Sequence, residues 1–215
     1  MKNKLKYMAL CLSLLIGVGA CSEEEIAYSA GEENKEVILQ LNCQLQTNQE
    51  VIVSRASTAE NRLNDLHFYV FNAAGELTGY KKLVATESSP IPTPGPETVT
   101  VKAITGEAYI YALANLNSTI YYLDDADKNK LTGIDEADVA GSSLTRDEFL
   151  AIDFKRQYGN ASHIISPNPT DGQFMMSGYL NGGKAVTITA GTNGAGVISE
   201  SNVIRPVSYT HLRSP

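Results

Sequence analysis

The fold is indicated first by a stretch with apolar side chains at alternate positions, Val37-Ile38-Leu39-Gln40-Leu41-Asn42-Cys43-Gln44-Leu45. Successive side chains of a β-strand point to opposite faces, so residues two apart share a face. One face of this stretch is entirely apolar, with Val37, Leu39, Leu41, Cys43 and Leu45. The pattern predicts a strand with one face on a hydrophobic core, in which Cys43 acts as a small buried apolar residue.

Other short apolar runs follow, and turn residues separate them. Residues 66–71 are apolar on both faces, which predicts a central strand. Asn72-Ala73-Ala74-Gly75 then predicts a turn into a strand over 77–84. Further strands are expected at 98–104, 108–114, 174–179 and 185–189, and from Val203 onward.

The stretch 118–154 differs from the rest because its apolar residues have helical spacing. Thr145-Arg146-Asp147-Glu148 has the form of a capping box, in which a threonine and a glutamate bind each other's backbone N–H groups at a helix start. One or two helices are therefore expected here. Together the elements predict a mainly β protein, a β-sandwich of about seven strands with a short helical insertion.

Composition and motifs exclude several functions. The chain has 17 basic and 24 acidic residues among its 215, and an acidic protein has no general affinity for nucleic acid phosphates. The sequence contains no HExxH, no CxxC pair and no GxSxG, and its three histidines lie far apart. We therefore expect neither an enzyme nor a cofactor, and we expect structural roles for His67 and His163.

Two motifs imitate ligand-binding sites. The first has Asp125, Asp127, Asn129 and Glu136 at the ligand positions of an EF-hand-like loop, but Lys130 stands where such a loop needs glycine. These four residues are weak candidates for metal ligands, and an acidic loop beside a helix is expected instead. The second, over 178–184, fits the GxxxxGK of a phosphate loop, but a strand is expected after it, so we predict a hairpin turn.

The N-terminus has the pattern of a bacterial export signal. Three lysines precede an apolar run over 8–18 that is too short to span a bilayer. Gly17-Val18-Gly19-Ala20-Cys21 then resembles the lipobox of bacterial lipoproteins. We expect a lipoprotein signal peptide over 1–20, a lipidated Cys21 as the first mature residue and an acidic linker over 21–35. The alternative is an ordinary cleaved signal with an incidental cysteine.

The residues after the cysteine also carry an address. Ser22-Glu23-Glu24-Glu25 resembles the surface-export signal of lipoproteins in the Bacteroidota, which implies an outward-facing location on the outer membrane. A solvated acidic tether is the alternative.

Five elements in order resemble the fimbrillins of Bacteroidota, the subunits of type V pili. They are the lipobox, the strand before Ser54-Arg55-Ala56, the segment 65–72 with Gly75, the segment 109–115 and the segment 174–178. The resemblance implies transthyretin-like β-sandwich domains, export as a lipoprotein, and assembly by strand exchange after an arginine-specific protease removes the N-terminal segment. The matching cleavage site is Arg55, with Ala56 as the new terminus. A plain exposed loop arginine is the alternative.

Cleavage there would let the strand over 37–45 leave its groove. A strand of a neighbouring subunit would then occupy the pockets of Val37, Leu39, Leu41, Cys43 and Leu45. The implied partners are other fimbrial subunits, the arginine-specific protease, the outer membrane through the lipid, and a host protein or glycan. The alternative is a non-polymerising surface lipoprotein of the same fold, either a pilus anchor, a tip adhesin or a glycan-binding module.

The C-terminal end departs from the resemblance. Residues 36–207 are expected to form the N-terminal sandwich domain, and residues 202–207 resemble the segment that leads into a second domain. Residues 208–215 resemble translated sequencing-adapter sequence. We therefore expect a non-native tail over 208–215, with the second domain and any C-terminal donor strand missing.

Overall fold

The structure, a computed structural model, describes residues 34–44, 63–86, 91, 97–116, 121–152, 155–156 and 175–208. All of them belong to one unit of the chain, Glu32–Pro215. The strands are β1 (Glu36–Cys43), β2 (Asp65–Asn72), β3 (Leu77–Val84), β4 (Glu97–Ile104), β5 (Gly106–Ala114), β6 (Tyr121–Tyr122), β7 (Lys155–Arg156), β8 (Met176–Tyr179), β9 (Val186–Ala190), β10 (Gly196–Ile198), β11 (Val203–Ile204) and β12 (Val207–Ser208). The helices are α2 (Asp125–Thr132) and α3 (Arg146–Ala151), with short 3-10 turns η1 (Val139–Gly141), η3 (Asn181–Gly183) and η4 (Thr192–Gly194).

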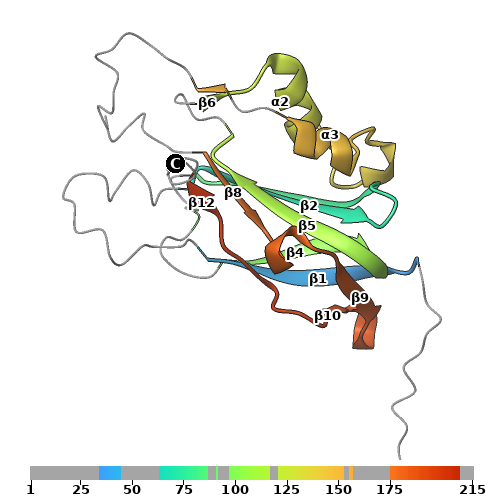
Figure 1. The fold of residues 1–215 in the computed structure, drawn as a ribbon. Coiled ribbons are helices and arrows are strands. Elements are labelled where there is room, and N and C mark those ends of the chain that lie inside the picture. Colours follow the sequence, from blue (N-terminus) through green and yellow to red (C-terminus); the bar gives the residue numbers. More distant parts are fainter. Residues whose placement is uncertain are drawn as a thin grey trace, which may run out of the picture. The chain divides into compact units, whose positions relative to one another are not determined.

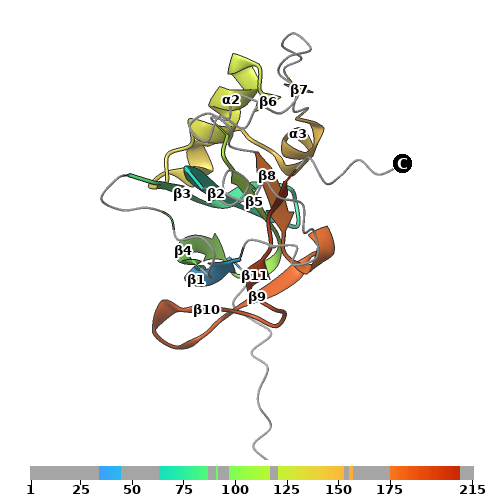
Figure 2. The same cartoon turned by 90° about the vertical axis from the view of Figure 1, so that its left-hand side faces the viewer.

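Two sheets face each other, and the helices lie on the outer side of the larger one (Figure 1 and Figure 2). The larger sheet has the order β10-β9-β5-β2-β3, and β8 pairs with β5 and with β12. The smaller sheet has the order β11-β1-β4. β6 and β7 form a separate two-stranded pair.

A hydrophobic core fills the space between the two sheets. β1, β4 and Ile204 of β11 supply its side chains from the smaller sheet, and β2 and β5 supply most of those from the larger one. Its largest fully buried members include Leu39, Leu41, Leu66, Phe68 and Ile110. The mainly β sandwich predicted from the sequence is confirmed, and the short strands β10 and β12 are additions to it.

A second hydrophobic cluster lies on the opposite face of the larger sheet, beneath the helical segment. Along β2, Phe68 and Val70 face the sandwich core, whereas Tyr69 and Phe71 face the helices. All four side chains are completely buried. The prediction of a central strand at this position is therefore confirmed, and the reason is that apolar layers cover both faces.

Helix α3 begins at the capping box that the sequence predicts. The Glu148 N–H donates to Thr145 Oγ1 at 3.3 Å, and the Thr145 N–H donates to Glu148 Oε2 at 3.1 Å. The helix packs through Phe149, whose ring centroid lies 4.9 Å from that of Tyr69 and 5.1 Å from that of Tyr111. No helix in the described ranges is long and apolar enough to cross a membrane.

The hairpin turn expected over 178–184 is wrong, although a strand does follow it. β8 and β9 do not pair with each other, because both pair antiparallel with β5, at Tyr111↔Tyr179 and at Ala108↔Val186. Between them, the Leu180 N–H still donates to Ile110 O at 2.9 Å. Leu180 is 1% exposed, so its burial keeps the chain on β5. The glycine-rich residues 181–183 therefore interrupt one continuous sheet edge.

Candidate functional site: strand β1 and the groove it fills

Strand β1 is held unequally at its two edges. β4 pairs with it antiparallel along its full length, from Glu36↔Ile104 to Cys43↔Glu97. On the other edge, among the described residues, β11 pairs with Asn42 and Cys43, the Gln44 N–H donates to Ile204 O at 2.9 Å, and an isolated bridge joins Ile38 to Ala195. Removal of β1 would therefore expose the whole edge of β4 that faces it. At the opposite edge of β1, removal would break pairings at a few positions.

The inner face of β1 shows the burial that its alternation predicts. Val37 is 1% exposed, Leu39 and Leu41 are 0% exposed and Cys43 is 2% exposed. Full burial of an aliphatic side chain of this size contributes about 1.5–3 kcal/mol. If β1 left the groove without a replacement, the apolar core residues that its side chains cover would face water. Leu45, the fifth residue of the predicted face, lies outside the described residues.

The groove has a close-fitting wall at Gly196 in β10. A Cβ placed on Gly196 would lie 2.5 Å from Leu39 Cδ2 and 2.8 Å from Val37 Cγ2. The backbone of β10 therefore lies directly against the side chains of β1. A strand with branched side chains can therefore fill this groove only if residue 196 has no Cβ.

Three of the four residues of the EF-hand-like motif lie in a helix and not in a loop. Asp125, Asp127 and Asn129 lie in helix α2, where acidic residues in the first turn are stabilised by the helix dipole. The expectation of an acidic loop is therefore wrong for these three residues, whereas Glu136 lies in the irregular segment after the helix. The described residues contain no cluster of three or more side chains able to hold a metal ion.

The carboxylate of Glu136 contacts strand β3 instead. Its Oε1 accepts from the Lys82 N–H at 2.8 Å, and its Oε2 lies 2.8 Å from Lys81 Nζ. β3 ends the larger sheet, so this carboxylate occupies a backbone donor on an outer strand edge. Such a contact makes the edge less available for pairing with another strand.

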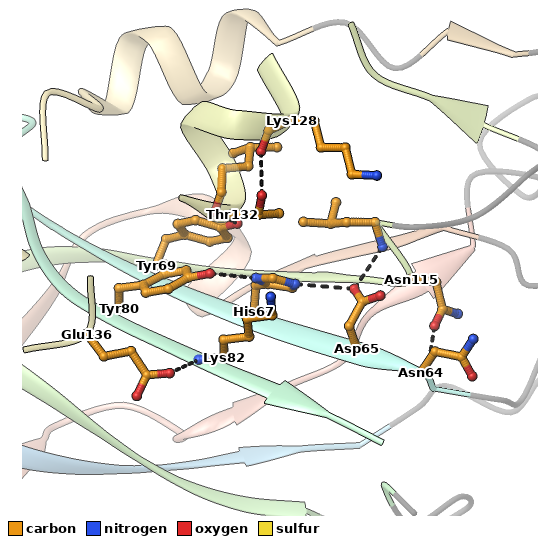
Figure 3. A network of polar contacts seen from close by, with 12 residues as sticks. Asn64, Asp65, His67, Tyr69, Tyr80, Lys82, Asn115, Lys128, Thr132 and Glu136 are labelled. Atoms are coloured by element: carbon orange, nitrogen blue, oxygen red, sulfur yellow. Dashed lines mark hydrogen bonds and ion pairs between the residues drawn. The ribbon is translucent and has the colours of Figure 1, made fainter. Parts of the chain in front are cut away.

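A buried polar network, which sequence reasoning missed, lies on the helix-facing side of β2 (Figure 3). His67 Nδ1 lies 2.8 Å from the Tyr80 hydroxyl, and Nε2 lies 3.3 Å from Asp65 Oδ1. The Leu116 N–H donates to that same carboxylate oxygen at 2.8 Å. These contacts join β2, β3 and the end of β5. Because His67 is 1% exposed, the network is closed to any substrate. The signal in the sequence is the spacing of Asp65, His67 and Tyr69 at period two.

This network predicts a loss of stability at alkaline pH. Burial raises the pKa of Tyr69 and of Tyr80, and the negative charges of Glu136 and Asp65 raise the pKa of Tyr80 further. Between the unfolded value near 10 and the raised folded value, only the unfolded chain releases these protons. The free energy of unfolding should therefore hold below about pH 10 and fall as the pH rises above it.

Urea unfolding followed across this range measures the effect. Tyr80→Phe should make the alkaline decline shallower, whereas Tyr179→Phe, at a tyrosine 56% exposed, should not change it. Identical declines in the wild type and Tyr80→Phe would contradict the assignment.

Comparison with known protein families shows which family the chain belongs to. The model of a family described as "Major fimbrial subunit protein (FimA)" matches residues 40–208, which include the second half of β1 and every later strand. The chain belongs to this fimbrial family. The predicted relationship to fimbrillins is therefore confirmed. The family is described as one of fimbrial subunits, and this agrees with the expectation that the chain is not an enzyme.

Solved structures of fimbrial proteins are also similar. The tip fimbrial protein Mfa3 from Porphyromonas gingivalis, with a C-terminal truncation, has 15% identity and a TM-score of 0.49 over 81% of this chain and 48% of that one. The fimbrial anchor protein Mfa2 from the same organism has 12% identity and a TM-score of 0.42 over 80% and 50%. The chain thus spans about half the length of these proteins. No curated protein sequence matches it.

Several predicted site residues of this FimA-family chain lie outside the described residues. They are Cys21, Arg55, Ala56 and Leu45. The structure brings together Val37, Leu39, Leu41 and Cys43 in one buried row. It leaves Asp125, Asp127 and Asn129 on a helix and directs Glu136 to β3.

Proposed function

We propose that this chain is a structural subunit of a cell-surface fimbria, exported as a lipoprotein and assembled by strand exchange at the groove of β1. The observation that carries the proposal is the pairing of β1. It forms a full-length ladder with β4 and buries four alternate side chains, yet the described residues hold its other edge at only a few positions. Such a strand can be replaced by another with the same alternation.

Replacement would keep the main-chain hydrogen bonds and the apolar burial almost unchanged. A strand from a second subunit would pair with β4 and insert its alternate side chains between the sheets. The contact would join two different surfaces of the subunits, so it would not close on itself and would build a filament.

The position of Arg55 suits this role. The described part of β1 ends at Cys43 and β2 begins at Asp65, so a cut after Arg55 would separate β1 from the rest of the sandwich without dividing any other described strand. The same cut would detach Cys21, with its lipid, from Ala56 and everything after it. Processing would then free the groove and release the sandwich from its anchor together.

Digestion of the folded full-length chain with an arginine-specific protease tests the processing step. We expect a new N-terminus at Ala56, no cut there in Arg55→Lys, and an unchanged cut in Arg62→Lys. A labelled peptide that copies residues 36–45 should be taken up after cleavage and not before it. An Arg55 that stays intact in the folded protein would contradict the processing step.

The alternative, a non-polymerising pilus anchor, tip adhesin or glycan-binding module, predicts a different outcome. Such a protein would keep its lipid, resist the protease and take up no peptide.

A further inference from the structure

Asn42 ties β1 to both of its neighbours through one side chain. Its Oδ1 accepts from Thr98 Oγ1 of β4 at 2.8 Å, and its Nδ2 donates to Asn202 Oδ1 at 3.2 Å. Its backbone N–H also donates to Asn202 O at 2.9 Å. Asn202 in turn donates from Nδ2 to Gln40 O at 3.0 Å. Thr98 and Asn202, which we call the amide clasp, therefore hold β1 from opposite edges (Figure 2 shows β1 between β4 and β11).

The chemistry of the clasp selects a carboxamide. The Thr98 hydroxyl donates to the side chain of Asn42, whereas Asn202 Oδ1 accepts from it. Among uncharged side chains, the carboxamides of asparagine and glutamine offer an acceptor oxygen and a separate donor nitrogen. A glutamine amide lies one methylene farther from the backbone, so it would not reach the same two atoms from the same position.

The clasp supplies information that the apolar face of β1 does not contain. Val37, Leu39, Leu41 and Cys43 form a row of similar buried side chains. A strand displaced by two residues would keep its apolar residues inward, so the row only weakly distinguishes one register from the next. Such a displacement would bring Gln40 or Gln44 to the clasp in place of Asn42.

We propose that Thr98 and Asn202 set the register of whichever strand fills this groove by binding an asparagine that stands between two inward-facing apolar residues. In the present chain that asparagine is Asn42, between Leu41 and Cys43. The same inference applies to a strand donated by another subunit. This part rests on the proposed strand exchange and defines the sequence that the donated strand needs. It is an extended strand with alternate apolar residues and an outward asparagine at the position of Asn42.

The part that concerns β1 is tested in the uncleaved full-length chain. Cys43 is 2% exposed, so the rate at which its thiol is alkylated reports how often the end of β1 opens. Peptide mass spectrometry separates it from Cys11 and Cys21. Asn42→Ala should raise the alkylation rate of Cys43 about tenfold, because two side-chain hydrogen bonds are lost.

Changes outside β1 separate the clasp from a local effect on Cys43. Asn202→Ala and Thr98→Val should each raise the rate, and Thr98→Val should add little to Asn42→Ala because both remove the same hydrogen bond. Gln40→Ala is the matched control, since it lies on the same outward face and keeps the carbonyl that Asn202 binds. Equal alkylation rates in the wild type, Asn42→Ala and Asn202→Ala would contradict the proposal that the amide clasp holds β1.

The part that concerns the partner is tested with peptides on the cleaved chain. A peptide copying residues 36–45 is compared with one carrying alanine at position 42 and one in which Gln40 and Asn42 are exchanged. We expect both altered peptides to dissociate about tenfold faster than the copy. Equal dissociation of all three would overturn the inference and leave strand exchange intact. No uptake of any peptide would contradict strand exchange itself, while the alkylation rates of the uncleaved chain would still decide the role of the clasp on β1.

Discussion

Leu39→Ala is expected to lower the free energy of unfolding by about 2–5 kcal/mol, the range for deletion of a leucine side chain from a well-packed core. Leu39 is 0% exposed, and its Cδ2 would lie 2.5 Å from a Cβ on Gly196. Alanine would leave a cavity between the sheets. Because rigid strand backbones bound that space, the surroundings cannot collapse fully into it.

Ile38→Ala is the matched control, and urea unfolding of both variants makes the comparison. Ile38 is the preceding residue of the same strand, but its side chain is 41% exposed. Its replacement should cost less than about 1 kcal/mol, mainly through lower strand propensity. Equal losses at the two positions would show that β1 is not packed as described. In the peptide assay, alanine at position 39 should likewise weaken uptake far more than alanine at position 38.

Gly79→Ala is expected to destabilise the protein by more than about 2 kcal/mol through overpacking. A Cβ on Gly79 would lie 2.0 Å from the Lys102 carbonyl oxygen and 3.2 Å from Val70 Cβ. β3 belongs to the larger sheet and β4 to the smaller, so the two sheets touch here through backbone. Neither partner can move aside as a flexible side chain would, and the added methyl group must push β3 away from β4.

Gly194→Ala separates this steric cost from the cost of backbone conformation. Gly194 has φ +76° and no atom within 4 Å of the added Cβ, so its replacement should cost only the roughly 1–2 kcal/mol of a left-handed residue. Thermal and urea unfolding of the two variants provide the comparison. A smaller loss at Gly79 than at Gly194 would contradict the close approach of β3 and β4.

The sequence predicted the elements well where a local pattern repeats. The period-two face of β1, the two-sided apolar pattern of β2 and the capping box at Thr145 each depend on residues near one another in the chain. Each pattern has a single physical interpretation, because a strand exposes alternate side chains and a helix start leaves N–H groups to be bound. These elements form as expected.

Predictions failed where distant residues compete for the same segment. The glycine-rich residues 181–183 allow a hairpin, but the ladder to β5 and the buried Leu180 keep the chain on the same edge. The acidic residues of α2 resemble a calcium loop, but Leu131 is 0% exposed and anchors a helix there instead. Both leucines are buried against residues from distant parts of the chain, and those partners are not visible in the local pattern.

The sequence by itself determined that the chain is a mainly β protein of the fimbrial family and which face of β1 is apolar, because alternation and motif order are properties of neighbouring residues. Only the tertiary structure decided which strands flank β1, where Gly196 and Gly79 meet other backbones, and how Asn42 meets Thr98 and Asn202. Asn42 and Asn202 are separated by 160 positions. Hydrogen bonds over such separations exist only once the sheets have packed, since packing alone brings their atoms within reach.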